Sequence, residues 1–309
     1  MTTPAPLPTR DGVGASCVVL PDGPWPTIAA FLVERFARVA PQAWTERIAA
    51  GRVVDAAGEP VTADRPYQRA LKVYYYRDPP AEAEWPQPET LVYRDAHIVV
   101  ADKPHFMPVT PSGRHLHQTL LVRLKRSLGI DTLAPVHRID RETAGLVLFT
   151  IDPATRGRYQ RLFAERDVDK RYECIAPWRA DAPASFVRRS RLVDDPAHFM
   201  RMAEVEGEPN AETIVRVIER RDALARYELA PRTGKRHQLR VHCAALGMPI
   251  LGDRIYPALH PADTDDTADP LRLLATSLAF TDPVTGAARR FESARRLEWP
   301  DDASASRHQ

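Results

Sequence analysis

The sequence predicts an α+β protein, and three observations support that prediction. Apolar stretches typical of strands and segments with apolar residues at helical spacing both recur along the 309 residues. They follow one another without the regular strand–helix–strand rhythm of a doubly wound sheet. No stretch approaches eighteen consecutive apolar residues, so a membrane-spanning helix is not expected. The expected architecture is a mixed, largely antiparallel sheet with flanking helices.

The N-terminal third predicts a small α/β module behind a loose leader. Residues 1–23 are rich in Pro and Thr and have no apolar run of the signal-peptide kind. Residues 27–51 carry apolar side chains at helical spacing, and Gly51 is a plausible helix end. The stretch VVDAAGEPV then predicts a short strand and a turn, and ALKVYYYR predicts a further strand.

The remaining elements are predicted in chain order. LVYRDAHIVVADKP indicates two short strands around a turn, and residues 118–129 a basic helix that ends at Gly129. An Asp–Pro pair opens a helix over 152–166. KRYECIAPW is typical of a strand, whereas 212–231 and 271–293 each favour a hairpin. The predicted organisation is a leader (1–23), an N-terminal module (24–78), a Pro-rich linker (79–90), a large domain (91–300) and a disordered tail (301–309).

Composition restricts the classes of partner and site. Cys17, Cys174 and Cys243 are odd in number and far apart, which argues against a disulfide scaffold and favours a reducing cytoplasm. The sequence contains no CxxC pair, so a zinc ribbon is not expected. The net charge is only +2, so any nucleic-acid surface must come from local clusters of basic residues.

The stretch PVHRIDRETAGLVLF, residues 135–149, concentrates charge immediately before an apolar strand. Asp140 lies between Arg138 and Arg141. Neighbouring guanidinium groups keep a carboxylate ionised, and an ionised carboxylate at a strand end can act as a nucleophile or a base. A surface ion pair is the commoner fate of a lone Asp. Here the concentration of charge in one turn favours the functional interpretation.

A second charged cluster, TGKRHQLRVH, spans residues 233–242. On a helix, Arg236 and Arg240 share a face, and so do His237 and Arg240. A basic helix start that only meets solvent is one interpretation. The alternative is contact with phosphate combined with a cation directed at a buried acid. Metal binding is not expected, because His237 and His242 are five residues apart, one too many for a helical HxxxH pair.

These motifs resemble the RluA-type pseudouridine synthases. HRIDRETAGLVLF is similar to the family's HRLDRxTSG motif, and DKPHFMPVTPSG to its DKPxGxxVxP segment. KRYECIA resembles its KxYxA strand, and residues 229–256 resemble its LxPxTGRxHQLRxHxxxxGxPIxGDxxY signature. The resemblance covers about 91–293 with the motifs in the family's order. The departures are Ile139 for Leu, Ala144 for Ser, Lys235 for Arg, and Phe106–Met107 after DKP.

The resemblance implies the fold, the reaction and the roles of individual residues. It implies a pseudouridine synthase fold with a central cleft, in which uracil is detached from C1′, rotated and rejoined through C5 without a cofactor. Asp140 matches the catalytic aspartate, Tyr172 the active-site tyrosine, and Arg240 the arginine paired with that aspartate. Arg138 matches the arginine that enters the space left by the flipped base.

The resemblance further implies structured RNA as the partner, either 23S rRNA or a tRNA stem-loop. The N-terminal module loosely resembles an S4-like RNA-binding domain, although a purely structural extension is an equal alternative. No obligate protein partner is evident, and a monomer is expected. The candidate RNA-binding residues are Arg138, Arg141, Lys235, Arg236, His237, Arg123, Lys125 and Arg126.

Two rival functions stay open at this point. The first is a catalytically silent RNA-binding protein on the same fold, against which the intact Asp140, Tyr172 and Arg240 argue. The second is a glycosidic hydrolase, which would need a second carboxylate placed to activate water. No sequence motif supplies that carboxylate.

Overall fold

The computed structural model describes residues 7–77, 82, 85, 87–113, 115–260 and 269–300. Half of the predicted linker (79–90) and the whole predicted tail (301–309) lie outside the described residues. The chain divides into two compact units. The first comprises Met1–Ala83, Pro111–His117 and Val122–Asp131, and the second comprises Glu84–Thr110, Gln118–Leu121 and Thr132–Gln309.

The first unit contains a three-stranded antiparallel sheet and two short helices. Its elements are β1 (Ser16–Val19), α1 (Ile28–Arg35), α2 (Pro41–Ala49), β2 (Val53–Asp55) and β3 (Lys72–Tyr75). The sheet order is β1-β3-β2. The helical pattern over 27–51 is divided into α1 and α2, because Pro41 cannot continue a helix but is suited to the first position of the next one.

Two of the predicted boundaries are wrong. The leader expected over 1–23 contributes β1, whose Ser16–Val19 pair with Tyr75–Lys72 of β3. The large domain expected over 91–300 loses two segments to the first unit. The physical reason is local packing, since Val13 joins Leu116 and Val122 in one buried apolar cluster.

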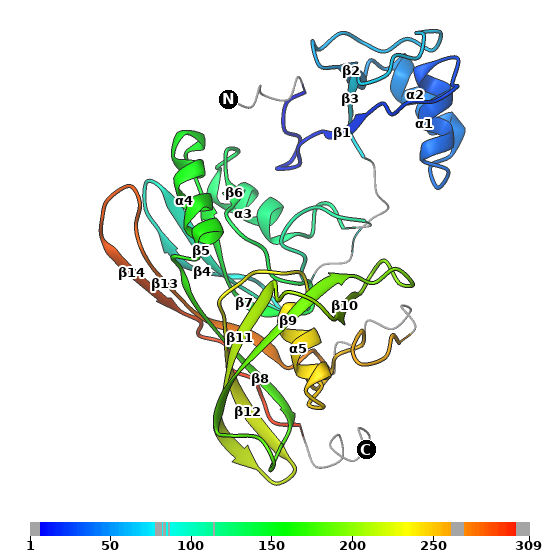
Figure 1. The fold of residues 1–309 in the computed structure, drawn as a ribbon. Helices are drawn as coiled ribbons and strands as arrows, with labels where there is room; N and C mark the ends of the chain where they lie inside the picture. The colour runs from blue at the N-terminus through cyan, green and yellow to red at the C-terminus, as the bar shows by residue number, and fades with distance from the viewer. Residues whose placement is uncertain are drawn as a thin grey trace. The chain divides into compact units, whose positions relative to one another are not determined.

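In the second unit the described residues form an eleven-stranded, largely antiparallel sheet (Figure 1). The strand order is β10-β9-β11-β12-β8-β13-β7-β5-β4, with β14 paired to β13 and β6 paired to β7. The strands are β4 (Thr90–Arg94), β5 (Ile98–Lys103), β6 (Ala134–Pro135), β7 (Ala144–Thr150), β8 (Asp169–Pro177), β9 (Ser185–Asp194), β10 (Met202–Val205), β11 (Ala211–Arg221), β12 (Leu224–Pro231), β13 (Leu273–Thr281) and β14 (Ala288–Glu292). The predicted mixed, largely antiparallel sheet is therefore confirmed.

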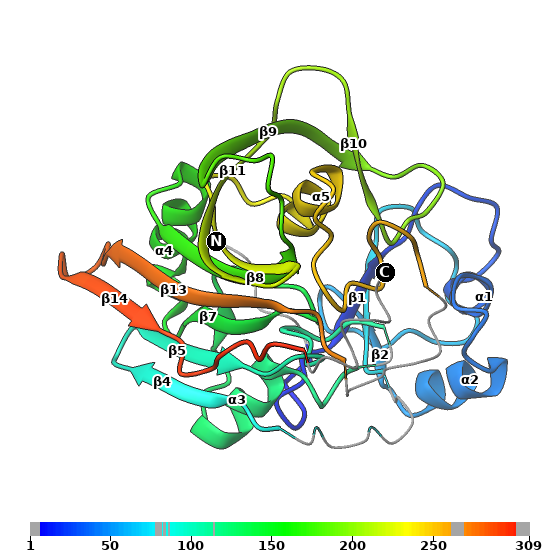
Figure 2. The same cartoon turned by 90° about the horizontal axis from the view of Figure 1, so that it is seen from below.

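Three more helices occur in the described residues. The other helices are α3 (Leu120–Leu128), which lies within the basic segment predicted as helical, α4 (Pro153–Glu165) and α5 (Gln238–Ala245). Helix α4 begins where Asp152 accepts a hydrogen bond from the Ala154 amide, as its Asp–Pro start predicts. It lies against β7, whereas α5 lies against β10 and β11 (Figure 2).

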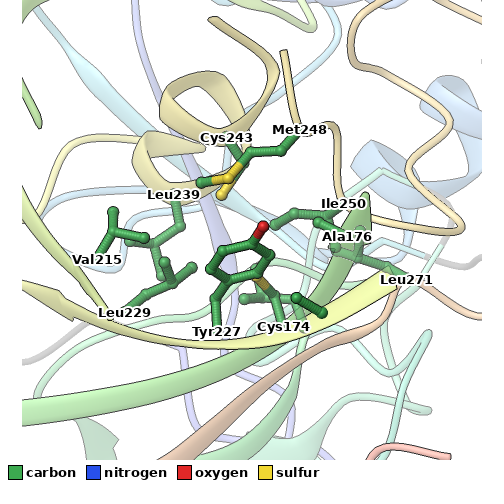
Figure 3. Close-up of a cluster of buried hydrophobic side chains, with 12 residues drawn as sticks. Cys174, Ala176, Val215, Tyr227, Leu229, Leu239, Cys243, Met248, Ile250 and Leu271 are labelled. Atoms are coloured by element: carbon green, nitrogen blue, oxygen red, sulfur yellow. The ribbon is translucent and has the colours of Figure 1, made fainter. Parts of the chain in front are cut away.

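The core beneath α5 fixes that helix on the sheet. Leu239 and Cys243 of α5 face Cys174 of β8 and Tyr227 of β12 in a buried cluster (Figure 3). Burial of each such side chain is worth about 1.5–3 kcal/mol. Because Arg240 follows Leu239 directly, this packing also fixes the position of its guanidinium group.

Candidate active site

The charged loop before β7 is anchored by its own histidine. His137 Nε2 accepts a hydrogen bond from the Leu148 amide at 3.1 Å, and its ring stacks on Phe163 with the centroids 4.5 Å apart. Burial lowers the pKa of His137 to about 3, so the ring is neutral and can accept this bond. His137 is therefore a structural residue of the loop.

Buried groups next to β5 hold the other end of the loop. Lys103, which is fully buried, donates from Nζ to the carbonyl oxygens of Pro104 and Arg141, both at 3.0 Å. Burial lowers its pKa to about 7, although the charges of Glu142 and Asp140 oppose that shift. His105 Nδ1 lies 2.6 Å from the carbonyl oxygen of Glu142. The backbone on the C-terminal side of Asp140 is thus bonded to the core.

The start of β7 runs close against β13. Gly145 has a φ of 113°, and a Cβ there would lie 2.3 Å from the Ala275 carbonyl oxygen. Only glycine can occupy this position without displacing a strand. Leu274 and Ala275 of β13 pair in parallel with Ala144 and Gly145. This close approach brings the loop onto the centre of the sheet.

Asp140 and Arg240, one hundred residues apart in sequence, meet at this place. Arg240 Nη1 donates to Asp140 Oδ2 at 3.3 Å. The Asp140 side chain keeps 24% of its surface exposed, whereas that of Arg240 keeps 1%. A carboxylate that is partly open to a substrate and held by a buried cation is suited to attack, or to stabilise, a positive charge that develops on a sugar.

Arg240 is held more tightly by a residue that the sequence analysis missed. Its Nε and Nη2 donate to the two carboxylate oxygens of Asp253 at 2.8 and 2.7 Å, and the Asp253 side chain is only 1% exposed. Glu142 lies 3.6 Å from Nη1. Burial alone would lower the pKa of Arg240, but the Asp253 hydrogen bonds and the charges of Asp253, Asp140 and Glu142 raise it. The guanidinium group is thus permanently charged and fixed in its plane.

Tyr172 lies on β8, opposite Leu229 of β12 and Ala275 of β13. Burial and the charge of Asp140 both raise its pKa, so the phenol stays protonated. The contact that the structure shows among the three residues predicted to be catalytic is the one between Arg240 and Asp140, and Tyr172 packs against the apolar cluster beneath α5.

Two polar residues of the TGKRHQLRVH cluster have structural roles. Gln238 accepts from the Thr233 hydroxyl at 2.7 Å and donates to the Glu212 carbonyl oxygen at 3.0 Å, which ties the turn before α5 to β11. His242 is buried between the hydroxyl groups of Ser190 and Thr213, at 3.0 and 2.9 Å. Of the charged residues in the cluster, Lys235 and Arg236 are exposed, whereas Arg240 is buried.

The candidate RNA-binding residues fall into two groups. Arg138 and Lys235 are exposed on the second unit, and Arg141 bonds Glu142 at 3.0 Å. Arg236 donates to Asp194 and to the Arg201 carbonyl oxygen, so it also braces the β9–β10 turn. The others lie in the part of α3 that belongs to the first unit, and these are Arg123, Lys125 and Arg126.

Two of these candidates have surroundings that sequence alone did not suggest. Arg126 donates to the Asp11 carbonyl oxygen at 2.8 Å and contacts His117 Nδ1 at 2.9 Å, so its guanidinium already has partners in the protein. His237 lies with Nε2 3.9 Å from Asp140 Oδ1, inside the site.

The residues that sequence reasoning missed are Lys103, Glu142, Asp253 and Tyr256. Asp253 and Tyr256 lie in the segment GDRIY, which the sequence identifies only as part of a family signature.

In the described part of the chain no three His, Cys, Asp or Glu side chains are grouped to hold a metal ion. No helix there is long and apolar enough to cross a bilayer.

Comparisons with known proteins show which family the chain is similar to. A family model described as RNA pseudouridylate synthase matches residues 97–245. An RNA pseudouridine synthase of Synechocystis sp. is 33% identical over 230 residues, covering 73% of this chain and 78% of that protein. The dual-specificity RNA pseudouridine synthase RluA of Escherichia coli is 33% identical over 206 residues, covering 66% of this chain and 91% of RluA.

Solved structures show the same fold. Human RNA pseudouridylate synthase domain containing 1 superposes with a TM-score of 0.56 at 20% identity, over 74% of this chain and 97% of that one. Human RNA pseudouridylate synthase domain containing 4 gives a TM-score of 0.53 at 24% identity, over 67% and 88%.

Proposed function

Because the chain belongs to the RluA-type RNA pseudouridine synthases, and is therefore an isomerase of uridine in RNA, we propose that Asp140 carries its chemistry on uridines of 23S rRNA or tRNA stem-loops. The observation that supports this most strongly is the partly exposed Asp140 carboxylate, which accepts a hydrogen bond from the buried Arg240 at 3.3 Å. We further propose that the protein works in the cytoplasm as a monomer.

In the proposed mechanism Asp140 acts on the sugar of a flipped uridine. Cleavage of the C1′–N1 bond builds positive charge on the ribose, which the carboxylate stabilises or captures. Arg240 orients that carboxylate through the hydrogen bond from Nη1 to Oδ2. Tyr172 offers an aromatic face to the base, and its hydroxyl, which stays protonated, can donate a hydrogen bond to the detached uracil. The proton that leaves C5 after the base is rejoined passes to water.

A glycosidic hydrolase fits the site less well. Glu142 is a second, partly exposed carboxylate next to Arg240, but its pKa is lowered because Arg240 and Arg141 offset the effect of burial. A hydrolase needs one carboxyl group with a raised pKa to protonate the leaving group. Glu142 is instead ionised and bonded to Arg141 at 3.0 Å.

The proposed substrates can be tested by mapping. Pseudouridines in rRNA and tRNA are compared between a strain lacking the gene and the same strain complemented by the wild-type protein or by Asp140→Asn. We expect sites that disappear on deletion and return only with the wild-type protein. If no rRNA or tRNA site changes on deletion, this substrate class is wrong.

The exposed Arg138 gives a separate prediction. If its guanidinium fills the gap left by the departing uridine, it offsets part of the unstacking cost, which is a few kcal/mol. Arg138→Ala should then slow single-turnover modification of a rigid stem-loop by about 10- to 100-fold, since 1.4 kcal/mol corresponds to a factor of ten. The defect should shrink on an RNA whose target uridine is already unstacked.

Lysine provides the matched variant for this test. Arg138→Lys keeps the charge but lacks the planar group that stacks on bases, so it should behave like Arg138→Ala. An equal loss on both RNAs, or full rescue by lysine, would show that Arg138 acts as a phosphate contact.

A further inference from the structure

His237 was predicted to contact RNA phosphate, but its surroundings are those of a residue that acts on Asp140. It begins α5 in the left-handed region, with a φ of 52°. Its side chain is only 11% exposed, and Nε2 faces Asp140 Oδ1 at 3.9 Å. A buried imidazole directed at a carboxylate is poorly placed to reach a phosphate.

A hydrogen-bonded chain determines which proton His237 presents. Tyr256 is buried, and its hydroxyl oxygen accepts the Met202 amide proton at 2.7 Å. His237 Nδ1 lies 3.1 Å from this oxygen, and we assign the hydroxyl as the donor because the oxygen already accepts from Met202. With Nδ1 accepting, the neutral ring carries its proton on Nε2, the atom that faces Asp140.

One turn supports both groups that contact Asp140. Asp253 Oδ1 accepts from the amides of Ile255 and Tyr256 at 2.9 and 3.1 Å, so Asp253 and Tyr256 are held in a fixed relation. Asp253 orients Arg240, which meets Asp140 Oδ2, and Tyr256 orients His237, which faces Oδ1. The ring of Tyr256 also lies under the Arg240 guanidinium, 5.6 Å from ring centroid to Cζ.

From this geometry we propose that His237, fixed by Tyr256, is a positioning residue that directs a neutral Nε2–H at Asp140 Oδ1 while Arg240 holds Oδ2. The proposal rests on the proposed role of Asp140. Nε2 is 3.9 Å from Oδ1 and Arg240 Nη1 is 3.3 Å from Oδ2, so a catalytic hydrogen bond from His237 that tightens when substrate binds would fix the plane of the carboxylate relative to the ribose. A correctly oriented carboxylate is what a preorganised site requires.

Burial favours the neutral form of His237, whereas the charged groups around it act in both directions. They are Asp140 and Glu142 from the loop before β7, and Arg240 and Arg236 from α5 and the turn before it. Burial lowers the pKa of His237, and the two arginines lower it further, against the opposing effect of the two carboxylates. Protonation in acid would place a full positive charge beside Asp140 and weaken it as a nucleophile or base.

Two substitutions distinguish the contact of the His237 side chain with Asp140 from the effect of its left-handed backbone conformation. Asparagine tolerates the left-handed conformation well but is too short to reach Asp140, so His237→Asn removes the contact and preserves the turn. His237→Gln has a longer side chain whose amide N–H can take the place of Nε2–H. Single-turnover rates and KM are measured on the shortest RNA that the wild-type protein modifies, together with Kd as a function of salt.

We expect His237→Asn to lower the single-turnover rate about tenfold or more, the scale seen when outer orienting partners are lost, with KM and the salt dependence unchanged. His237→Gln should recover part of the rate. In a profile of single-turnover rate against pH, the loss of rate in acid should occur at lower pH for His237→Gln than for the wild-type protein, because glutamine does not titrate. A raised KM with a weaker salt dependence and an unchanged rate would instead identify His237 as a phosphate contact.

Tyr256→Phe tests the same chain from its other end. It should lower the rate in the same direction, because His237 loses the group that fixes its tautomer. Tyr227→Phe is the matched control, since Tyr227 is equally buried and its hydroxyl bonds the Pro177 carbonyl oxygen at 2.9 Å, apart from the Asp140 contacts. Equal rates for both tyrosine variants would overturn the proposal, as would equal losses in His237→Asn and His237→Gln with no shift in the pH at which the rate is lost in acid. Activity of Asp140→Asn would instead contradict the proposed function.

Discussion

Asp140→Asn is expected to fold and to bind RNA but to form no detectable pseudouridine. The substitution keeps the size and hydrogen-bonding shape of the side chain and removes the charge that would stabilise or capture the ribose cation. Asp140 is partly exposed and its loop is anchored independently through His137 and Lys103, so the fold should not depend on the carboxylate. The measurement is tritium release from RNA labelled at uridine C5.

The control for this prediction is a carboxylate with similar surroundings. Glu142 is also 24% exposed and also faces Arg240, at 3.6 Å. Glu142→Gln should therefore keep most of the turnover if Asp140 alone reacts with the sugar. Substantial activity in Asp140→Asn, or a lower turnover in Glu142→Gln than in Asp140→Asn, would show that Asp140 is not the catalytic residue.

Arg240→Met should impair both turnover and stability. Removing the guanidinium leaves Asp253, which is 1% exposed, as an unpaired buried carboxylate. Breaking a buried ion pair in this way costs about 3–5 kcal/mol. Turnover should fall strongly because Asp140 loses the group that orients its carboxylate. Denaturant unfolding and single-turnover assays measure the two effects.

A double variant separates these two effects. In Arg240→Met/Asp253→Asn the buried charge is gone, while the asparagine oxygen can still accept from the amides of Ile255 and Tyr256. The double variant should regain part of the lost stability but none of the lost turnover. If turnover returns together with stability, Arg240 is only a structural residue; if Arg240→Met is as stable as the wild-type protein, the buried pair is not important for folding.

Much of the fold follows directly from sequence patterns. Strand β7 is a continuous apolar run, AGLVLFT, buried at every position, and such runs are easily recognised. The hairpins formed by β11 with β12 and by β13 with β14 carry strand-forming residues on both sides of a turn. The start of helix α4 is predicted by Asp152, which caps the helix, and by Pro153 at its first position.

Other elements were not recognisable because their patterns are weak. Strand β9, SFVRRSRLVD, and strand β10 carry many charged or exposed residues, so neither was predicted. Strand β1 has only four residues and exists because β3 pairs with it. In each case the partner strand, and not local preference, decides the structure.

The sequence by itself determined the chemistry available to this protein. The order of its motifs identified the family, and the family identified Asp140, Tyr172 and Arg240 as the residues to examine. Local patterns can do this because they record which residue types follow one another along the chain.

Only the tertiary structure decided how these residues work together. Arg240 meets Asp140 across one hundred residues, and its strongest partner is Asp253. His237 proved to face Asp140, although its place in a basic cluster had predicted RNA contact. The physical reason is that burial and distance set the strength of these charge interactions. Both are fixed when α5, the β7 loop and the Asp253 turn pack together, and neither is written in the spacing of residues along the chain.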